Sequence, residues 1–186
     1  QAEALPFTDV AEGAWYNDAV AYVYRNGLMA GVSSTQFAPD STLNRATLAT
    51  ILWRLAGEPV VNYVLPFEDV AEGEWYSEAI RWAASTGIVN GTTPTTFRPF
   101  NSVTREQMAA MVHRYAEYMD YDTTATTDLN TFTDAASVNG YAAEPMGWCV
   151  AEGLISGIGT EIRPQSSATR AQIATMLMRL GESVAQ

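Results

Sequence analysis

Three arginines of this 186-residue chain stand at one repeated position where a cation could bind an anionic ligand. Each is the second residue of a tetrapeptide that predicts the start of a helix: Asn44-Arg45-Ala46-Thr47, Thr104-Arg105-Glu106-Gln107 and Thr169-Arg170-Ala171-Gln172. The helix dipole is positive there, so a cation is unfavourable and acidic residues are preferred. A guanidinium beside free helix N–H groups would instead form an anion site. The alternative is that each arginine pairs with a carboxylate, such as Asp9 or Asp69, and ties two segments together.

Aromatic residues and glycines recur around these arginines. Trp15 and Trp75 occupy matching positions, and we place Gly140 at that position in the third copy. Each tryptophan either packs in the core or stacks on a sugar ring at the rim of a groove. Three glycines predict tight turns and would also let a ligand approach the backbone. They are Gly31, Gly91 and Gly157.

Other repeated charges have simpler interpretations. Three arginines lie near the C-terminal ends of the same predicted helices, where a cation complements the dipole; they are Arg54, Arg114 and Arg179. Three aspartates are expected to cap or turn the chain before a helix; they are Asp9, Asp69 and Asp134. Arg98 and Arg163 precede prolines and are expected in extended loops.

The residue types argue against catalysis. His113 is the only histidine, Cys149 is the only cysteine, and the chain has no lysine. With one histidine and one cysteine, a Cys–His pair is not expected beyond chance, and a cysteine-cluster metal site is excluded. The absence of lysine excludes Schiff-base chemistry. The polar signature is repeated in every copy, which favours multivalent binding over a single active site. We therefore predict that the chain is not an enzyme and has neither a cofactor nor a metal.

The composition limits the kinds of partner that the chain is expected to bind. A formal net charge of -11 argues against a nucleic-acid partner and against binding to an anionic membrane. No apolar run approaches the roughly 20 residues that a membrane helix needs, so no membrane insertion is expected. Hydrophobic residues make up 47% of the chain, which is enough for a packed core.

The sequence consists of three copies of one unit. Phe7-Thr8-Asp9-Val10 with Trp15-Tyr16 recurs as Phe67-Glu68-Asp69-Val70 with Trp75-Tyr76, and a weaker copy begins at Phe132. A Gly-x-x-x-Gly motif and a Phe-x-Pro motif follow in order, the third copy having isoleucine for phenylalanine. We place the repeats at 1–57, 67–117 and 132–186, joined by linkers at 58–66 and 118–131.

Each copy is predicted to be a helix, a loop and a second helix, which makes the fold mainly helical (all-α). Gly27, Gly87 and Gly153 stand where a C′ glycine would end the first helix. Pro145 fits only a first turn, so the first helix of the third copy should start late. Copies two and three should have capping boxes at their second helices. One unit cannot bury its apolar stripe alone, so three should close around a pseudo-threefold axis.

The motifs resemble the S-layer homology (SLH) domain family over nearly the whole chain. The resemblance implies a three-pronged spindle at the bacterial cell surface, attached non-covalently to the cell wall. It also implies an extracellular location and a glycan partner, an anionic secondary cell-wall polysaccharide that often carries pyruvate ketals on N-acetylmannosamine. A monomer would suffice, because the threefold symmetry is internal.

The resemblance further implies that ligands bind in grooves between neighbouring repeats. We expect Arg45 to share a groove with Trp75 and the turn Asn90-Gly91-Thr92. Arg170 should share one with Trp15 and the Gly31 turn. Arg105 should face copy three, where Gly140 replaces tryptophan, and this groove is expected to be the weakest.

Two alternatives remain open from the sequence. In the first, the chain is a structural module that assembles with other copies in a surface lattice. In the second, it is the anchoring part of a larger carbohydrate-active enzyme.

Overall fold

The computed structural model describes residues 4–185, so the outer limits of the predicted repeats, at 1–3 and 186, lie outside the described residues. Six α-helices form within that range: α1 Asn17–Arg25, α2 Arg45–Leu55, α3 Ser77–Ser85, α4 Arg105–Tyr118, α5 Gly140–Ala151 and α6 Arg170–Arg179. Short 3-10 helices, η1 Leu129–Thr131 and η2 Ala135–Ser137, precede α5, and a π-helical turn, η3 Leu180–Val184, follows α6. Residues 4–185 contain isolated β-bridges and no strand. The prediction of a mainly helical chain is confirmed.

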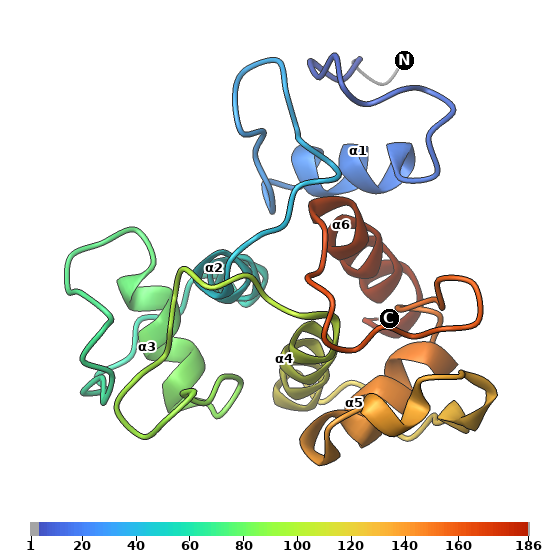
Figure 1. Cartoon of the computed structure of the whole chain (residues 1–186). Helices are drawn as coiled ribbons and strands as arrows, with labels where there is room; N and C mark the ends of the chain where they lie inside the picture. Colours follow the sequence, from blue (N-terminus) through green and yellow to red (C-terminus); the bar gives the residue numbers. More distant parts are fainter. Residues whose placement is uncertain (1–3, 186) are drawn as a thin grey trace.

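The helices pack between repeats. Each first helix lies against the second helix of the preceding copy, so α3 packs on α2, α5 on α4, and α1 on α6 (Figure 1). The last pairing joins the two ends of the chain. Apolar side chains fill these contacts, among them Val20, Val23 and Ile80, which are almost completely buried. The structure thus shows which helices bury the apolar stripe that one unit cannot bury alone.

Backbone hydrogen bonds also run from each copy to the next. The first two amides of α2 donate to Asn101 and Pro99 at 3.0 and 2.9 Å. The first two amides of α4 donate in the same way to Ser166 and Pro164, and those of α6 to Ser41 and Pro39. The sequence of donors therefore passes from copy one to two, from two to three and from three back to one.

The repeated aspartates fix the loop that accepts these bonds. Asp9 accepts the amides of Phe37 and Ala38 at 2.9 and 2.8 Å, some 28 residues further along the chain. Asp69 and Asp134 hold the corresponding loops. In these loops, the residue before the proline has a left-handed backbone conformation, with φ of 57° at Ala38 and Arg98. The expectation of extended loops at Arg98 and Arg163 is therefore wrong, because Asp69 and Asp134 clamp two consecutive amides and curl the backbone.

The helix ends mostly follow the sequence. Gly27, Gly87 and Gly153 have positive φ just after the first helices, as a C′ glycine does. Thr104 and Thr169 form complete capping boxes with Gln107 and Gln172. Both predictions are confirmed.

The predicted late start of α5 is wrong. Pro145 lies inside α5, which begins at Gly140. Pro145 precedes Gly153 by eight residues, as Ala19 in the first turn of α1 precedes Gly27. Helix α5 therefore carries an additional turn before the proline. Pro145 occupies the position that lies in the first turn of the corresponding helix in the other copies, where the backbone amide has no partner within the helix.

Candidate functional site

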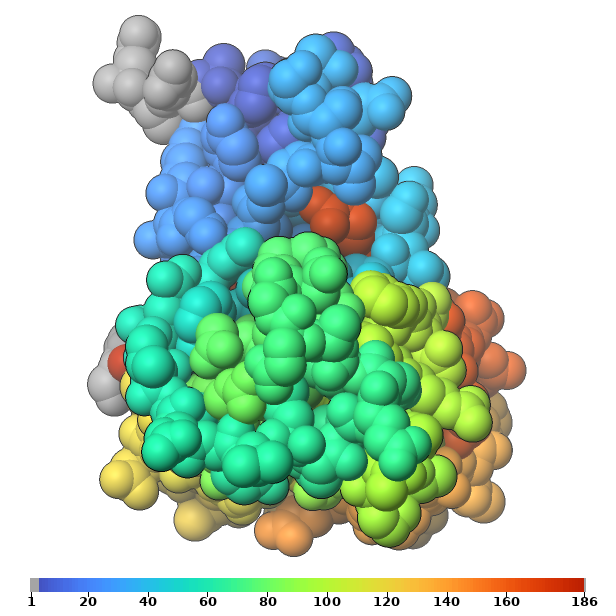
Figure 2. All heavy atoms as spheres, turned by 90° about the vertical axis from the view of Figure 1, so that its left-hand side faces the viewer, coloured from blue at the N-terminus to red at the C-terminus, as the bar shows by residue number. Residues whose placement is uncertain are grey.

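Three grooves lie between the repeats, and we name each after its aromatic residue. The Trp15 groove holds Trp15, Arg105, Arg179, Gln172 and the turn 155–158, and has a volume of about 210 Å³. The Tyr141 groove holds Tyr141, Arg45, Arg114, Gln107 and the turn 89–92, at about 390 Å³. The Trp75 groove holds Trp75, Arg170, Arg54, Thr47 and the turn 28–31, at about 240 Å³. In Figure 2, atoms of the third copy, coloured red-orange, are visible in the hollow between the first and second copies.

Each groove combines all three repeats. One copy gives the arginine at the start of a helix, the next copy gives the glycine turn and a second arginine, and the remaining copy gives the aromatic ring. Arg45 lies with the turn Asn90–Thr92, and Arg170 lies with Gly31. The aromatic partners were assigned wrongly: Arg45 lies with Tyr141 rather than Trp75, and Arg170 lies with Trp75 rather than Trp15.

The Arg105 groove also differs from expectation, because it contains Trp15 and does not lack a tryptophan. Two facts explain these corrections. The aromatic residue lies at the start of a first helix, just before α1 and α3 and in the first turn of α5, and that helix packs on the preceding copy. The third copy also has one extra residue between Asp134 and Gly153, which are 19 positions apart where Asp9 and Gly27 are 18 apart, so Tyr141, not Gly140, precedes Gly153 by the twelve residues that separate Trp15 from Gly27.

The arginines at the helix starts are buried and bound to backbone oxygens. Arg45 is 7% exposed, and its Nε and Nη2 donate to Phe97 and Asn90 carbonyls at 3.0 and 3.1 Å. Its guanidinium lies 4.5 Å from the centre of the Phe97 ring. Arg105 binds Ile162 and Ser156 in the same way, and Arg170 binds Phe37 and Ala30. Each arginine therefore ties one repeat to the next through carbonyls.

The alternative of an ion pair with Asp9 or Asp69 is wrong in its partner, because both carboxylates are bound to loop amides. Burial lowers the pKa of the three guanidinium groups, and the positive charge of Arg114 lowers the pKa of Arg45 further. Arginine still stays charged in proteins. Across residues 4–185, no hydrogen bond engages Nη1 of these three arginines.

The expected anion site at the helix N–H groups is also wrong. In α2, the amides of Arg45 and Ala46 donate to the neighbouring repeat, and the Thr47 amide donates to the Asn44 side chain at 2.8 Å. The other two helices use their first amides in the same way. The charged donors that line each groove are therefore guanidinium groups and not helix amides.

Sequence reasoning missed the second arginine of each groove. Arg114 lies half-buried beside Arg45, and its Nη1 donates to the Ile88 carbonyl at 3.3 Å. Arg54 and Arg179 occupy the same place in the other grooves. The signal was present in the sequence, since each of them follows the first arginine of its own copy by nine residues. No aspartate or glutamate is among the residues that line these three grooves. Each groove is therefore a positive site on an acidic protein.

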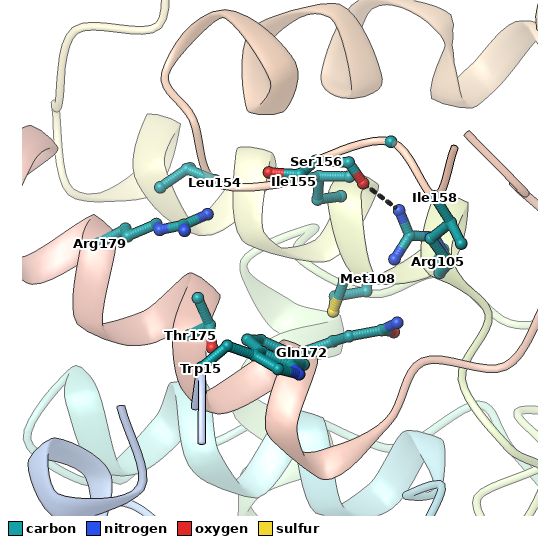
Figure 3. Close-up of a pocket in the computed structure, with 11 residues that line it drawn as sticks. Trp15, Arg105, Met108, Leu154, Ile155, Ser156, Ile158, Gln172, Thr175 and Arg179 are labelled. Atoms are coloured by element: carbon teal, nitrogen blue, oxygen red, sulfur yellow. Dashed lines mark hydrogen bonds between the residues drawn. The ribbon is translucent and has the colours of Figure 1, made fainter. Parts of the chain in front are cut away.

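The aromatic residues of the grooves are exposed. Trp15 is 66% exposed, Trp75 56% and Tyr141 49%, whereas Trp82 and Trp148 are fully buried in the core. In Figure 3, Trp15 lies beside Gln172, while Arg105 and Arg179 approach the space from opposite sides. The core interpretation of Trp15 and Trp75 is wrong, since an exposed ring has a free face on which a sugar can stack.

The glycines of the turns are required by close packing. A Cβ on Gly31 would lie 2.5 Å from Cε1 of Phe7, and one on Gly157 would lie 2.5 Å from Cε1 of Phe132. Gly91 has the same relation to Phe67. Any side chain here would displace the phenylalanine that leads the repeat.

Comparison with known proteins identifies the repeats. Three segments, 6–49, 66–109 and 131–174, match the S-layer homology domain family. The chain belongs to the S-layer homology domain family. Each matched segment ends just before the second arginine of its groove, Arg54, Arg114 or Arg179.

Relatives of this SLH chain are segments of larger proteins. The chain is 29% identical over 182 residues to an endoglucanase of Bacillus sp. (strain KSM-635), covering 97% of this chain and 19% of the enzyme. It is 29% identical to an amylopullulanase of Thermoanaerobacterium thermosulfurigenes, covering 95% and 9%. It is 26% identical to the S-layer protein sap of Bacillus anthracis, covering 93% and 21%. The chain thus spans about a fifth or less of these relatives.

The SLH repeats are a cell-surface module. Family membership and the S-layer relatives indicate a location at the cell surface. His113 packs against the Trp148 ring in the core, and Cys149 is fully buried, so neither side chain lines a groove. Burial also raises the pKa of the Cys149 thiol. None of the helices in residues 4–185 is long and apolar enough to span a membrane.

Proposed function

We propose that this SLH module anchors a surface protein to the cell wall by binding an anionic wall polysaccharide in its three grooves. The observation that carries the proposal is the pairing of two arginines with one exposed aromatic ring in every groove, without a carboxylate in the lining. A pyruvate ketal on a sugar offers the carboxylate and the apolar ring face that such a groove fits.

The two arginines divide the work. The first is fixed by its two carbonyl bonds, so Nη1 is held in place for a ligand carboxylate without further loss of side-chain freedom. The second is held by one carbonyl bond and adds a charge from the other side. A hydrogen bond to a charged group contributes about 1.5–3 kcal/mol. One groove would therefore bind modestly, and three grooves on one polymer would gain from effective concentration.

The scaffold for this multivalency is, in our proposal, a closed pseudo-threefold spindle that acts as a monomer. The cyclic order of the backbone bonds and the pairing of α1 with α6 support it. The closure would aim the three grooves in different directions, which suits a polymer that wraps the module.

The test compares two triple variants that each remove three positive charges. One carries Arg54→Gln, Arg114→Gln and Arg179→Gln in the grooves, and the control carries Arg25→Gln, Arg98→Gln and Arg163→Gln outside them. In co-sedimentation with purified cell walls, the groove variant should remain in solution and the control should bind. Equal binding of the two variants would reject the grooves as the wall-binding sites.

A second candidate is assembly of the module with its own copies. The observation in its favour is the apolar linker 58–66, where Val60 and Val64 are 88% and 87% exposed. Sedimentation velocity on the chain without glycan decides this: a growing assembly that Val60→Ser and Val64→Ser abolish would support a lattice role. A monomer at all concentrations would leave wall binding as the function.

A further inference from the structure

Glu106 is unusual among the charged residues of the chain. It is 3% exposed, and it is the only carboxylate buried to this degree between residues 4 and 185. The matching positions in the other two copies are Ala46 and Ala171. A buried carboxylate costs free energy unless its oxygens accept hydrogen bonds, so its partners identify what it holds in place.

Every hydrogen-bond partner of the Glu106 carboxylate belongs to the third copy. The amide of Asn139 donates to Oε2 at 3.0 Å, and the Asn139 side-chain amide donates to Oε1. The Tyr141 hydroxyl and the Gln165 side chain each donate to Oε1 at 3.4 Å. Burial and the nearby charge of Glu106 raise the pKa of the Tyr141 phenol, so it remains a donor at neutral pH.

These bonds fix the residues that start α5. Asn139 is the N-cap of α5, but its own side chain caps no helix amide because it binds Glu106. Tyr141 stands two residues later in the additional turn of α5, and its ring lines the Tyr141 groove. In the other two grooves the wall is a tryptophan that no such carboxylate holds.

The Tyr141 groove also has the largest volume of the three grooves. Its volume of about 390 Å³ compares with about 210 and 240 Å³ for the grooves with a tryptophan. Small-ligand sites usually have volumes of roughly 300–1,000 Å³, and of the three grooves this one alone has a volume within that range. A smaller ring in a larger groove needs a separate support to keep one position.

We propose that the Tyr141 groove is a distinct site for a disaccharide unit of the anionic glycan, and that Glu106 is the positioning residue that holds its aromatic wall. The proposal rests on the proposed function, since it takes the grooves to be glycan sites. It assigns different ligands to the grooves: the two tryptophan grooves bind a single anionic sugar, and the Tyr141 groove also contacts its neighbour in the polymer.

One arm of the test needs no ligand. In the chain labelled with ¹³C at the tyrosine rings, NMR relaxation reports the order of the Tyr141 ring. Glu106→Ala should make this ring mobile, whereas Glu144→Ala, which removes an exposed carboxylate from the same helix, should not. An unchanged Tyr141 ring in folded Glu106→Ala would overturn the positioning role. If that variant does not fold, Tyr141→Phe with labelled phenylalanine rings provides the equivalent measurement, because it removes the hydroxyl that donates to Oε1 of Glu106.

The second arm uses a background in which Trp15→Ala and Trp75→Ala weaken the other two grooves. The probes are the methyl glycosides of pyruvylated N-acetylmannosamine and of a disaccharide that contains it, titrated by calorimetry. The disaccharide should bind more tightly, and Glu106→Ala should weaken it by roughly tenfold, the equivalent of one hydrogen bond. Glu106→Ala with Tyr141→Trp recreates the alanine–tryptophan pair of the other copies, so it should bind the monosaccharide and lose the preference.

Equal affinity for the two probes, or a preference that survives in the double variant, would refute a distinct disaccharide site. Failure of both probes to bind even the wild-type chain would count against the proposed function, and the ring-order measurement would still decide whether Glu106 positions Tyr141.

Discussion

Replacing each arginine of the Trp15 groove with alanine should separate structure from binding. Arg105 is buried and donates to the carbonyls of Ile162 and Ser156 at 2.9 and 2.8 Å. Losing two bonds from a charged donor costs about 3–5 kcal/mol. For a chain of this size, that lowers the melting temperature by roughly 10 °C. Arg179 makes one exposed bond to the Gly153 carbonyl at 2.8 Å, so its removal should cost about 1 kcal/mol or less.

The assay combines calorimetric unfolding with titration of a pyruvylated sugar. Both variants should weaken binding to the Trp15 groove, by roughly tenfold for each lost charged contact, but only Arg105→Ala should lose much stability. The reasoning fails if Arg179→Ala is as destabilised as Arg105→Ala, since the carbonyl bonds would then not carry the difference. It also fails if Arg179→Ala binds as well as the wild type, because the second arginine would then contribute nothing to the groove.

Three further predictions use matched or internal controls. Trp75→Ala should change stability by less than about 1 kcal/mol because the ring is more than half exposed, while calorimetry should show one groove lost. Gly31→Ala should cost about 1–3 kcal/mol through overpacking, whereas Gly13→Ala, which meets no atom within 4 Å, should be near neutral in urea unfolding. Burial raises the pKa of Asp134, but the amides of Ile162 and Arg163 outweigh it, so the pKa lies below its ordinary value. Its stabilisation is therefore complete above about pH 4 and is lost as the pH falls through the lowered pKa; Asp134→Asn should flatten that dependence in melting curves.

Local features were predictable from the sequence because local residues determine them. The capping boxes at Thr104 and Thr169 and the C′ glycines depend on residues three or four positions apart. These contacts follow from motifs whose geometry is the same in many proteins.

The groove composition was not predictable because it depends on packing between repeats. Nothing in the periodicity of α1 says that it packs on α6, about 150 residues away. Without that pairing, Trp15 was assigned to Arg170 rather than to Arg105. One extra residue between Asp134 and Gly153 also shifted the alignment, so that Tyr141 was overlooked in favour of Gly140.

The arginines show why one residue can have two roles. The ion-pair alternative was right that Arg45, Arg105 and Arg170 tie the repeats together, although carbonyls are the partners. The anion-site interpretation is wrong about the helix amides, which donate within the protein, and stays a proposal for the guanidinium group that faces the groove. A rigidly held guanidinium is a better ligand donor than a free one, because its ordering has already occurred in folding.

Calorimetry of the chain against purified wall polysaccharide, before and after chemical removal of its pyruvate, tests the central claim most directly. If paired arginines recognise a carboxylate on the glycan, removing the pyruvate should abolish the measurable heat of binding. Added salt should weaken binding to the untreated polysaccharide, because it screens the charges. Unchanged affinity for the polysaccharide without pyruvate would contradict the claim that the grooves recognise this anion.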